Sequence, residues 1–125
     1  MPSDRIPAIK LLLLPKDTNA LGTIFGGVIL SNIDLASAVE ARKAAPLRYV
    51  TKAMREVEFH QPVFVGDVLS LYADTSRVGR TSLTIRVRVC ARRRTDPDQN
   101  VNVTEAEVIF VSVDESGTPV PVFGD

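Results

Sequence analysis

The sequence has little of the two side chains that most often bind metals, with one cysteine and one histidine in 125 residues. A single cysteine, Cys90, excludes an intramolecular disulfide and is typical of a reducing compartment, so we expect the cytoplasm. His60 lies 30 residues before Cys90, and no ligand motif surrounds either residue, which excludes a zinc site of ordinary spacing. The chemistry is therefore left to carboxylates, amides, hydroxyls and backbone dipoles.

A long apolar run and an excess of charge are also missing. Fifteen basic residues balance fifteen acidic ones, so the overall charge gives no reason to expect a nucleic acid or a membrane surface as partner. The longest apolar run, residues 9–14, contains Lys10 and is far shorter than the roughly 20 residues of a membrane helix. The first residues do not resemble a signal peptide. We expect one domain over residues 1–125, with residues 1–7 as a loose N-terminal end.

The stretch between Pro15 and Pro46 predicts a turn-rich loop followed by a long helix over residues 24–45. Apolar side chains surround this helix on nearly all sides, a pattern typical of a buried helix. Thr23 is the expected N-cap. Gly26 and Gly27 in the first turn place bare N–H groups at the positive helix end, which suits binding of a carbonyl or oxyanion oxygen. Close packing against a sheet is the alternative reason for the two glycines.

One row of this helix has small side chains and a single carboxylate. Its members follow the spacing four, three, four, three: Gly27, Ser31, Asp34, Ala38 and Ala41. Small side chains let a ligand or another backbone come close, and an ionised carboxylate in an apolar element is costly unless a polar group meets it. Asp34 is therefore the first candidate for a functional residue, with a structural carboxylate as the alternative.

The remainder of the chain predicts strands. They are expected at residues 8–14, 48–59, 68–77, 81–92 and 103–113, with an edge strand at 118–122. Alternation in residues 81–92 places Leu83, Ile85, Val87 and Val89 on one face and polar residues on the other. The order of elements predicts an α+β fold in which a curved antiparallel sheet of five or six strands wraps one central helix. Exposed sheet edges favour pairing with a second copy, so we expect at least a homodimer.

Several short motifs, correctly ordered and spaced, together resemble one family. They are Asp17-Thr18-Asn19, Ile24-Phe25-Gly26-Gly27, Ser31-Asn32-Ile33-Asp34-Leu35-Ala36, Val50-Thr51, Val65-Gly66-Asp67-Val68, Gly79-Arg80-Thr81-Ser82 and Val103-Thr104-Glu105-Ala106. Through these motifs, residues 12–120 resemble the hotdog-fold acyl-CoA thioesterases of the YciA and brain acyl-CoA hydrolase type.

The resemblance implies hydrolysis of an acyl-CoA to a fatty or other carboxylic acid and coenzyme A. It implies no metal and no cofactor, since coenzyme A is part of substrate and product, and a homodimer or a trimer of dimers with sites at the subunit interface. Asp34 and Asn19 match the family's residues tied to catalysis, and Gly26 and Gly27 match those that receive the thioester carbonyl. The stretch that lies along coenzyme A is matched by Gly79, Arg80, Thr81 and Ser82.

Within this family, Asp34 is expected to act as a general base on water, with direct attack on the thioester carbon as the alternative. Asn19 is expected to position the water or the carbonyl from the partner subunit, although asparagine is also a common turn residue. Arg80 is expected to contact the pantetheine or a phosphate. His60 is expected to stay outside the chemistry, and residues 92–94 to form a solvated loop rather than a neighbour of the 3′-phosphate.

Two other functions fit parts of the pattern. An acyl-CoA sensor on the same fold normally carries a separate DNA-binding segment, and about seven residues precede the first expected strand. A hotdog enoyl-CoA hydratase or dehydratase would pair an aspartate with a histidine, and His60 lies in no such motif. The thioesterase is therefore the leading hypothesis, and the sequence leaves the acyl-chain length open.

Overall fold

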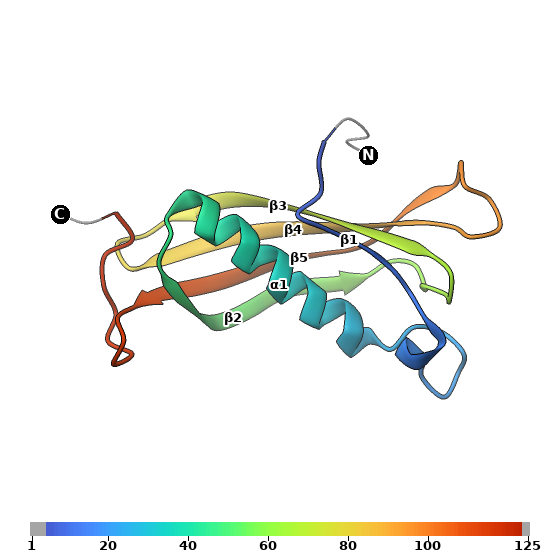
Figure 1. Ribbon diagram of the computed structural model, residues 1–125, viewed down its shortest axis with the longest axis horizontal. Helices are drawn as coiled ribbons and strands as arrows, with labels where there is room; N and C mark the ends of the chain where they lie inside the picture. The colour runs from blue at the N-terminus through green and yellow to red at the C-terminus, as the bar shows by residue number, and fades with distance from the viewer. Residues whose placement is uncertain (1–4, 124–125) are drawn as a thin grey trace.

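The computed structural model describes residues 5–123 as one antiparallel sheet with a long helix along one face (Figure 1). The elements are β1 (Ile9–Leu12), the 3-10 turn η1 (Pro15–Asp17), α1 (Gly26–Ala44), β2 (Arg48–Phe59), β3 (Val68–Val78), β4 (Ser82–Arg92) and β5 (Asn100–Val113). The strands lie in the order β1-β3-β4-β5-β2, and every neighbouring pair is antiparallel. The α+β architecture predicted from the sequence is confirmed, with five strands.

The core is the layer between α1 and the sheet. The alternation predicted for β4 is confirmed, since its inward side chains are fully buried: Leu83, Ile85, Val87 and Val89. The helix contributes Ile29, Ile33 and Ala36 to the same layer. Full burial of a large aliphatic side chain contributes about 1.5–3 kcal/mol, so this layer supplies much of the driving force for folding. It also fixes which side of α1 faces away from the sheet.

One side of α1 is left uncovered. Leu35 and Val39 are 57% and 43% exposed although they lie in the middle of the helix. The expectation of a helix buried on all sides is therefore wrong for a single chain, because one sheet covers only the side of the helix that packs on it. The result is an exposed apolar strip on α1, formed by these two residues.

The helix begins at Gly26, two residues later than predicted, and its N-cap is Phe25 rather than Thr23. Ile24 forms an isolated β-bridge and donates its N–H to the carbonyl of Val63 at 2.8 Å, which holds it in an extended conformation. The expected N-cap was wrong because a hydrogen bond to a distant loop, and not local sequence, decides where the helix starts.

The edge strand predicted for residues 118–122 does not form. Within these residues there is only an isolated bridge, between Pro119 and Val113. Pro119 and Pro121 have no N–H to donate, so a continuous ladder cannot be built there. The sheet therefore ends at β2 on one side and β1 on the other.

The segment before β1 is attached to the sheet by a side chain. Residues 1–4 of the expected loose end lie outside the described residues. Arg5 donates two hydrogen bonds, of 2.7 and 2.9 Å, to the carboxylate of Asp74 on β3. β1 itself is shorter than the predicted 8–14. In residues 5–123, no helix has the length and apolar character needed to cross a bilayer.

Candidate active site

The carboxylate of Asp34 lies where α1 meets the edge strand β2. Its Oδ1 accepts a hydrogen bond of 2.8 Å from Thr51 Oγ1. Asp34 is half-buried and Thr51 is exposed, so solvent and ligands can reach the pair. The hydrogen bond orients the carboxylate through one oxygen and leaves the other available to accept a proton. Thr51 is a site residue to which the sequence assigned no role, because a hydroxyl within a strand gives no local signal of its partner.

The small row predicted on α1 surrounds this carboxylate. Gly27, Ser31 and Ala38 are at least partly accessible, whereas Ala41 is fully buried. The Ser31 hydroxyl donates to a carbonyl within the helix at 2.9 Å and so does not compete for Asp34. Asp34 is therefore the one ionisable group in this row of small side chains, to which a ligand can come close.

The start of α1 presents backbone N–H groups without a side-chain cap. The N-cap Phe25 makes no side-chain capping hydrogen bond, and the N–H groups of Gly26 and Gly27 lie in the first turn, where no intrahelical carbonyl can accept them. A Cβ added to Gly27 would lie 2.5 Å from Cε2 of Phe25, so this glycine makes room for the ring. At Gly26 the nearest atom would be Cζ of Phe59, at 3.9 Å. Close packing explains Gly27, and oxyanion binding by either N–H stays a prediction.

The amide of Asn19 closes the loop before the helix. Its Oδ1 accepts hydrogen bonds from the N–H of Leu21 (2.8 Å) and of Thr23 (3.2 Å), and its Nδ2 donates to Thr23 Oγ1 (2.9 Å). The Thr23 hydroxyl, expected to cap the helix, is used in this loop instead. In a single chain Asn19 therefore acts as a turn residue, and its catalytic role stays a prediction.

A cavity of about 230 Å³ lies beside the helix start. Residues of the preceding loop, the first turns of α1 and the end of β2 line it: Thr23, Ile24, Gly26, Ile29, Phe59, His60, Gln61, Pro62 and Val63. Most of these side chains are apolar, which suits an aliphatic group better than a charged one. The exposed His60 lies at this cavity, a position that the sequence did not predict.

The stretch predicted to lie along coenzyme A is at the opposite end of the molecule. A carbonyl of the hairpin at residues 79–82 accepts a hydrogen bond from the N–H of Ser112, which pairs with Tyr49 at the start of β2. Gly26, in contrast, lies beside Phe59 at the end of β2. The intervening ten residues of strand span on the order of 30 Å, and Figure 1 shows the helix start and this hairpin at opposite ends. One chain does not bring the two groups of predicted residues together.

Residues 92–94 do not form a uniformly solvated loop. Arg93 Nη1 donates to Asp67 Oδ2 at 2.6 Å and to the carbonyl of Pro62 at 2.9 Å. The side chains of Arg93 and Asp67 are only 12% and 3% exposed, and the guanidinium lies over the ring of Phe64. The expectation is wrong for Arg93 because a buried carboxylate must be paired, and this arginine supplies the pairing charge.

A long helix laid along a five-stranded antiparallel sheet, with an accessible carboxylate on that helix, defines a hotdog-fold protein with a candidate acid–base site. Among solved structures, Cj0915, a hexameric hotdog fold thioesterase of Campylobacter jejuni, superposes with a TM-score of 0.89 at 44% identity, covering 94% of this chain and 90% of that one. HI0827, a hexameric broad specificity acyl-coenzyme A thioesterase, has a TM-score of 0.87 at 36% identity, covering 94% of this chain and 80% of that one.

Sequence comparison agrees with the structural one. The thioesterase superfamily model matches residues 21–97. The acyl-CoA thioester hydrolase YciA of Salmonella typhimurium is 39% identical over 116 residues, which cover 91% of this chain and 87% of that protein. The chain belongs to the thioesterase superfamily, among its hotdog-fold acyl-CoA thioester hydrolases. The family resemblance read from the sequence motifs is confirmed.

Proposed function

We propose that this protein hydrolyses acyl-CoA thioesters to a free carboxylic acid and coenzyme A, with Asp34 as the general base. One observation carries the assignment of the base: Thr51 orients the accessible Asp34 carboxylate, in the row of small side chains on α1, through a 2.8 Å hydrogen bond. Membership of the acyl-CoA thioester hydrolases supports the reaction class. Coenzyme A enters as part of the substrate and leaves as product, and no metal or other cofactor takes part. We place the enzyme in the cytoplasm, which its single cysteine supports.

In the proposed reaction, Asp34 removes a proton from water as the water oxygen attacks the thioester carbon. The resulting oxyanion is stabilised by N–H groups of Gly26 or Gly27 at the positive end of α1, where one such donor contributes on the order of 3 kcal/mol to transition-state stabilisation. Collapse of the tetrahedral intermediate breaks the carbon–sulfur bond. The leaving thiolate then takes the proton that Asp34 removed, which regenerates the base.

A second copy of the chain completes this site. The helix start and the hairpin at residues 79–82 are too far apart in one chain to contact the same substrate. Two-fold pairing through the edges of β2 would bring the hairpin of one copy close to the helix start of the other. Exposed apolar side chains favour such a pairing, because the dimer would cover them. Val50 on β2 and the two residues of the apolar strip, Leu35 and Val39, are each more than 40% exposed. We propose a homodimer with shared sites, assembled as a hexamer like the solved relatives.

In this dimer the hairpin binds coenzyme A. The stretch is formed by Gly79, Arg80, Thr81 and Ser82. The Arg80 side chain is exposed and makes no ion pair with any residue from 5 to 123, so its charge is available for a phosphate or the pantetheine. We also propose that Asn19 of one copy lies near the Asp34 carboxylate of the other, where its amide is suited to position water.

The test is release of free thiol from a panel of acyl-CoAs, short to long, by the wild type and by Asp34→Ala and Asp34→Asn. Both variants should lose at least about a hundredfold in kcat while still binding coenzyme A, because they remove the base and keep the rest of the site. Circular dichroism and sedimentation control for fold and assembly. A wild type that binds acyl-CoA but releases no thiol from any of them would identify a sensor, and hydration of an enoyl-CoA would identify a hydratase.

A single turnover in water labelled with heavy oxygen tests for direct attack by Asp34, because only that route can place the label in the protein. If Asp34 acts as a base, the label enters the carboxylic acid directly. If Asp34 attacks the thioester carbon, thiolate leaves and a mixed anhydride forms. Water attack on its aspartyl carbonyl then places the label in the protein, whereas water attack on its acyl carbonyl places the label in the acid. Mass spectrometry of the peptide that contains Asp34 reads the difference.

A further inference from the structure

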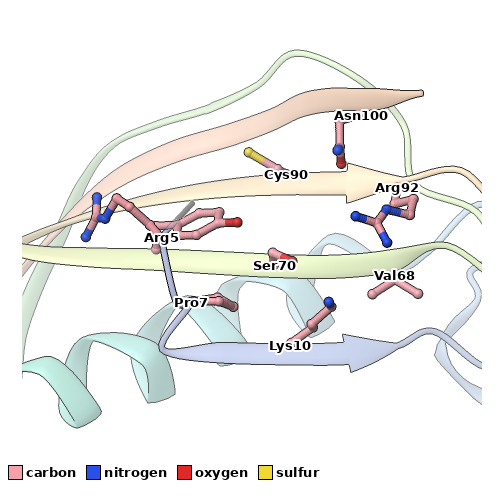
Figure 2. A pocket seen from close by; sticks show the side chains of 9 residues that line it. Arg5, Pro7, Lys10, Val68, Ser70, Cys90, Arg92 and Asn100 are labelled. Carbon is pink, nitrogen blue, oxygen red and sulfur yellow. The ribbon is translucent and has the colours of Figure 1, made fainter. Parts of the chain in front are cut away.

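A second cavity lies on the face of the sheet that points away from α1. Its volume is about 140 Å³. On β3, Leu69 and Leu71 point into the core, so Ser70 between them points to the opposite face, where it lines this cavity (Figure 2). The walls come from β1, β3, β4, the beginning of β5 and the segment before β1. The sheet itself therefore separates this cavity from Asp34.

The lining of this cavity is basic. Arg5, Lys10 and Arg92 contribute to it, and none of the described residues that line it is acidic. The charge of Arg5 is compensated by Asp74 at 2.7 Å. Lys10 and Arg92 form no ion pair with any residue from 5 to 123. Figure 2 shows the Lys10 ammonium and the Arg92 guanidinium directed toward the space beside Ser70, whereas the Arg5 guanidinium points away.

The other arginines of β4 on this face have their charges compensated. On β4, Arg86 and Arg88 stand opposite Glu107 and Glu105 of β5 and form ion pairs with them at 3.8 and 3.3 Å. Further along the same strand, Arg92 stands opposite Asn100. The series of glutamates on β5 therefore ends before it reaches the cavity.

Neutral donors take the place of those carboxylates. Lys10 stands opposite Ser70 in the register of β1 and β3, and the Ser70 hydroxyl and the Asn100 amide both line the cavity. Two like charges beside neutral donors are stabilised by an anion with several acceptor oxygens. A phosphate group has three strong acceptor oxygens and close to two negative charges at neutral pH. The cavity, with a volume of about 140 Å³, has room for a phosphate group.

We propose that this cavity binds a phosphate group through Lys10 and Arg92, with Ser70 and Asn100 as additional donors. The group is recognised either as inorganic phosphate or as the terminal monoester of a larger ligand whose remainder lies outside. This site is independent of the proposed hydrolysis, because it lies on the other face of the sheet from Asp34 and uses none of the residues placed at the active site.

The test is isothermal titration of the full-length protein with inorganic phosphate, with AMP and with adenosine, in a buffer of low ionic strength. Phosphate and AMP should bind and adenosine should not. Lys10→Gln and Arg92→Gln should each weaken phosphate binding roughly tenfold to a hundredfold, because each removes a charge-assisted hydrogen bond. Lys10→Arg should restore most of the affinity lost in Lys10→Gln, which separates loss of charge from loss of fold. If AMP binds more tightly than phosphate, the ligand is a phosphorylated molecule; equal affinities identify inorganic phosphate.

Two control variants decide where phosphate binds. Arg77→Gln removes an exposed arginine from the same face, which has no ion-pair partner in residues 5–123 and whose strand neighbour is Thr84. Arg80→Gln removes the cation of the hairpin proposed to bind coenzyme A. Both should leave phosphate affinity unchanged. Equal losses in Arg77→Gln and Lys10→Gln would show diffuse attraction to the surface, and a loss confined to Arg80→Gln would place phosphate at the hairpin; either result overturns the proposal, as does the absence of phosphate binding.

Discussion

The ion pair between Asp67 and Arg93 yields a stability prediction that can be worked out from its geometry. The Asp67 carboxylate is 3% exposed and accepts hydrogen bonds from Arg93 Nη1 at 2.6 Å and from the N–H of Phe64 at 2.9 Å. The pair connects the turn after β2 to the loop between β4 and β5. Because both side chains are largely shielded from water, removing one of them leaves the other as an uncompensated charge.

Breaking a buried pair by removing one partner costs about 3–5 kcal/mol. We expect Arg93→Met to lie near the upper part of that range, since the remaining Asp67 carboxylate is almost fully buried. Asp67→Ala should lie near the lower part, because the Arg93 side chain is 12% exposed and can turn toward solvent. For a domain of this size, 3 kcal/mol corresponds to a fall in melting temperature of roughly 10 °C.

Urea unfolding at fixed protein concentration measures these costs, since the stability of an oligomer depends on concentration. Asp67→Ala combined with Arg93→Met should cost less than the sum of the single variants by about 2 kcal/mol or more, because no charge is left unpaired. The matched control is Asp74→Ala, which breaks the exposed pair with Arg5 and should cost less than about 1 kcal/mol. If Asp67→Ala costs no more than Asp74→Ala, burial does not determine the strength of this pair and the reasoning is refuted.

Three further predictions follow from single contacts. Thr51→Val removes the hydroxyl that orients Asp34. A hydrogen bond to a charged group contributes about 1.5–3 kcal/mol and this one is accessible to water, so kcat in the thiol-release assay should fall about tenfold. Thr51→Ser should restore kcat, whereas an unchanged kcat in Thr51→Val would contradict the role of Thr51. Gly27→Ala displaces the exposed Phe25 ring at the start of α1, beside the N–H groups proposed to bind the oxyanion, so kcat should fall. Alanine favours the helix by about 1 kcal/mol, so the melting temperature should not fall, and a drop of several degrees would argue against this. Burial raises the pKa of the Cys90 thiol, which lowers its thiolate fraction at neutral pH. A disulfide reagent should therefore react more slowly with the native protein than with the urea-unfolded chain, and its reaction should become faster as the pH rises. Equal rates for the native and unfolded protein would contradict this prediction.

The sequence by itself determined the elements whose signal is local. The bounds of β2 agree with the prediction at both ends, and the inward face of β4 follows from strict alternation of apolar and polar residues. The row of small residues around Asp34 was also readable, since helical periodicity places residues three and four apart on one side. These features depend on neighbours within a few residues, which is the range over which sequence patterns carry information.

Only the tertiary structure decided the features that depend on distant segments. Thr51 reaches Asp34 because β2 lies beside α1. Arg93 is buried against Asp67 because two turns far apart in sequence lie side by side. The helix starts at Gly26 since a loop carbonyl holds the preceding residues extended. The separation of the helix start from the hairpin at residues 79–82 likewise follows from packing, because the length of β2 lies between them. Such contacts join residues through space, and no periodicity in the chain specifies which side chains the fold will bring together.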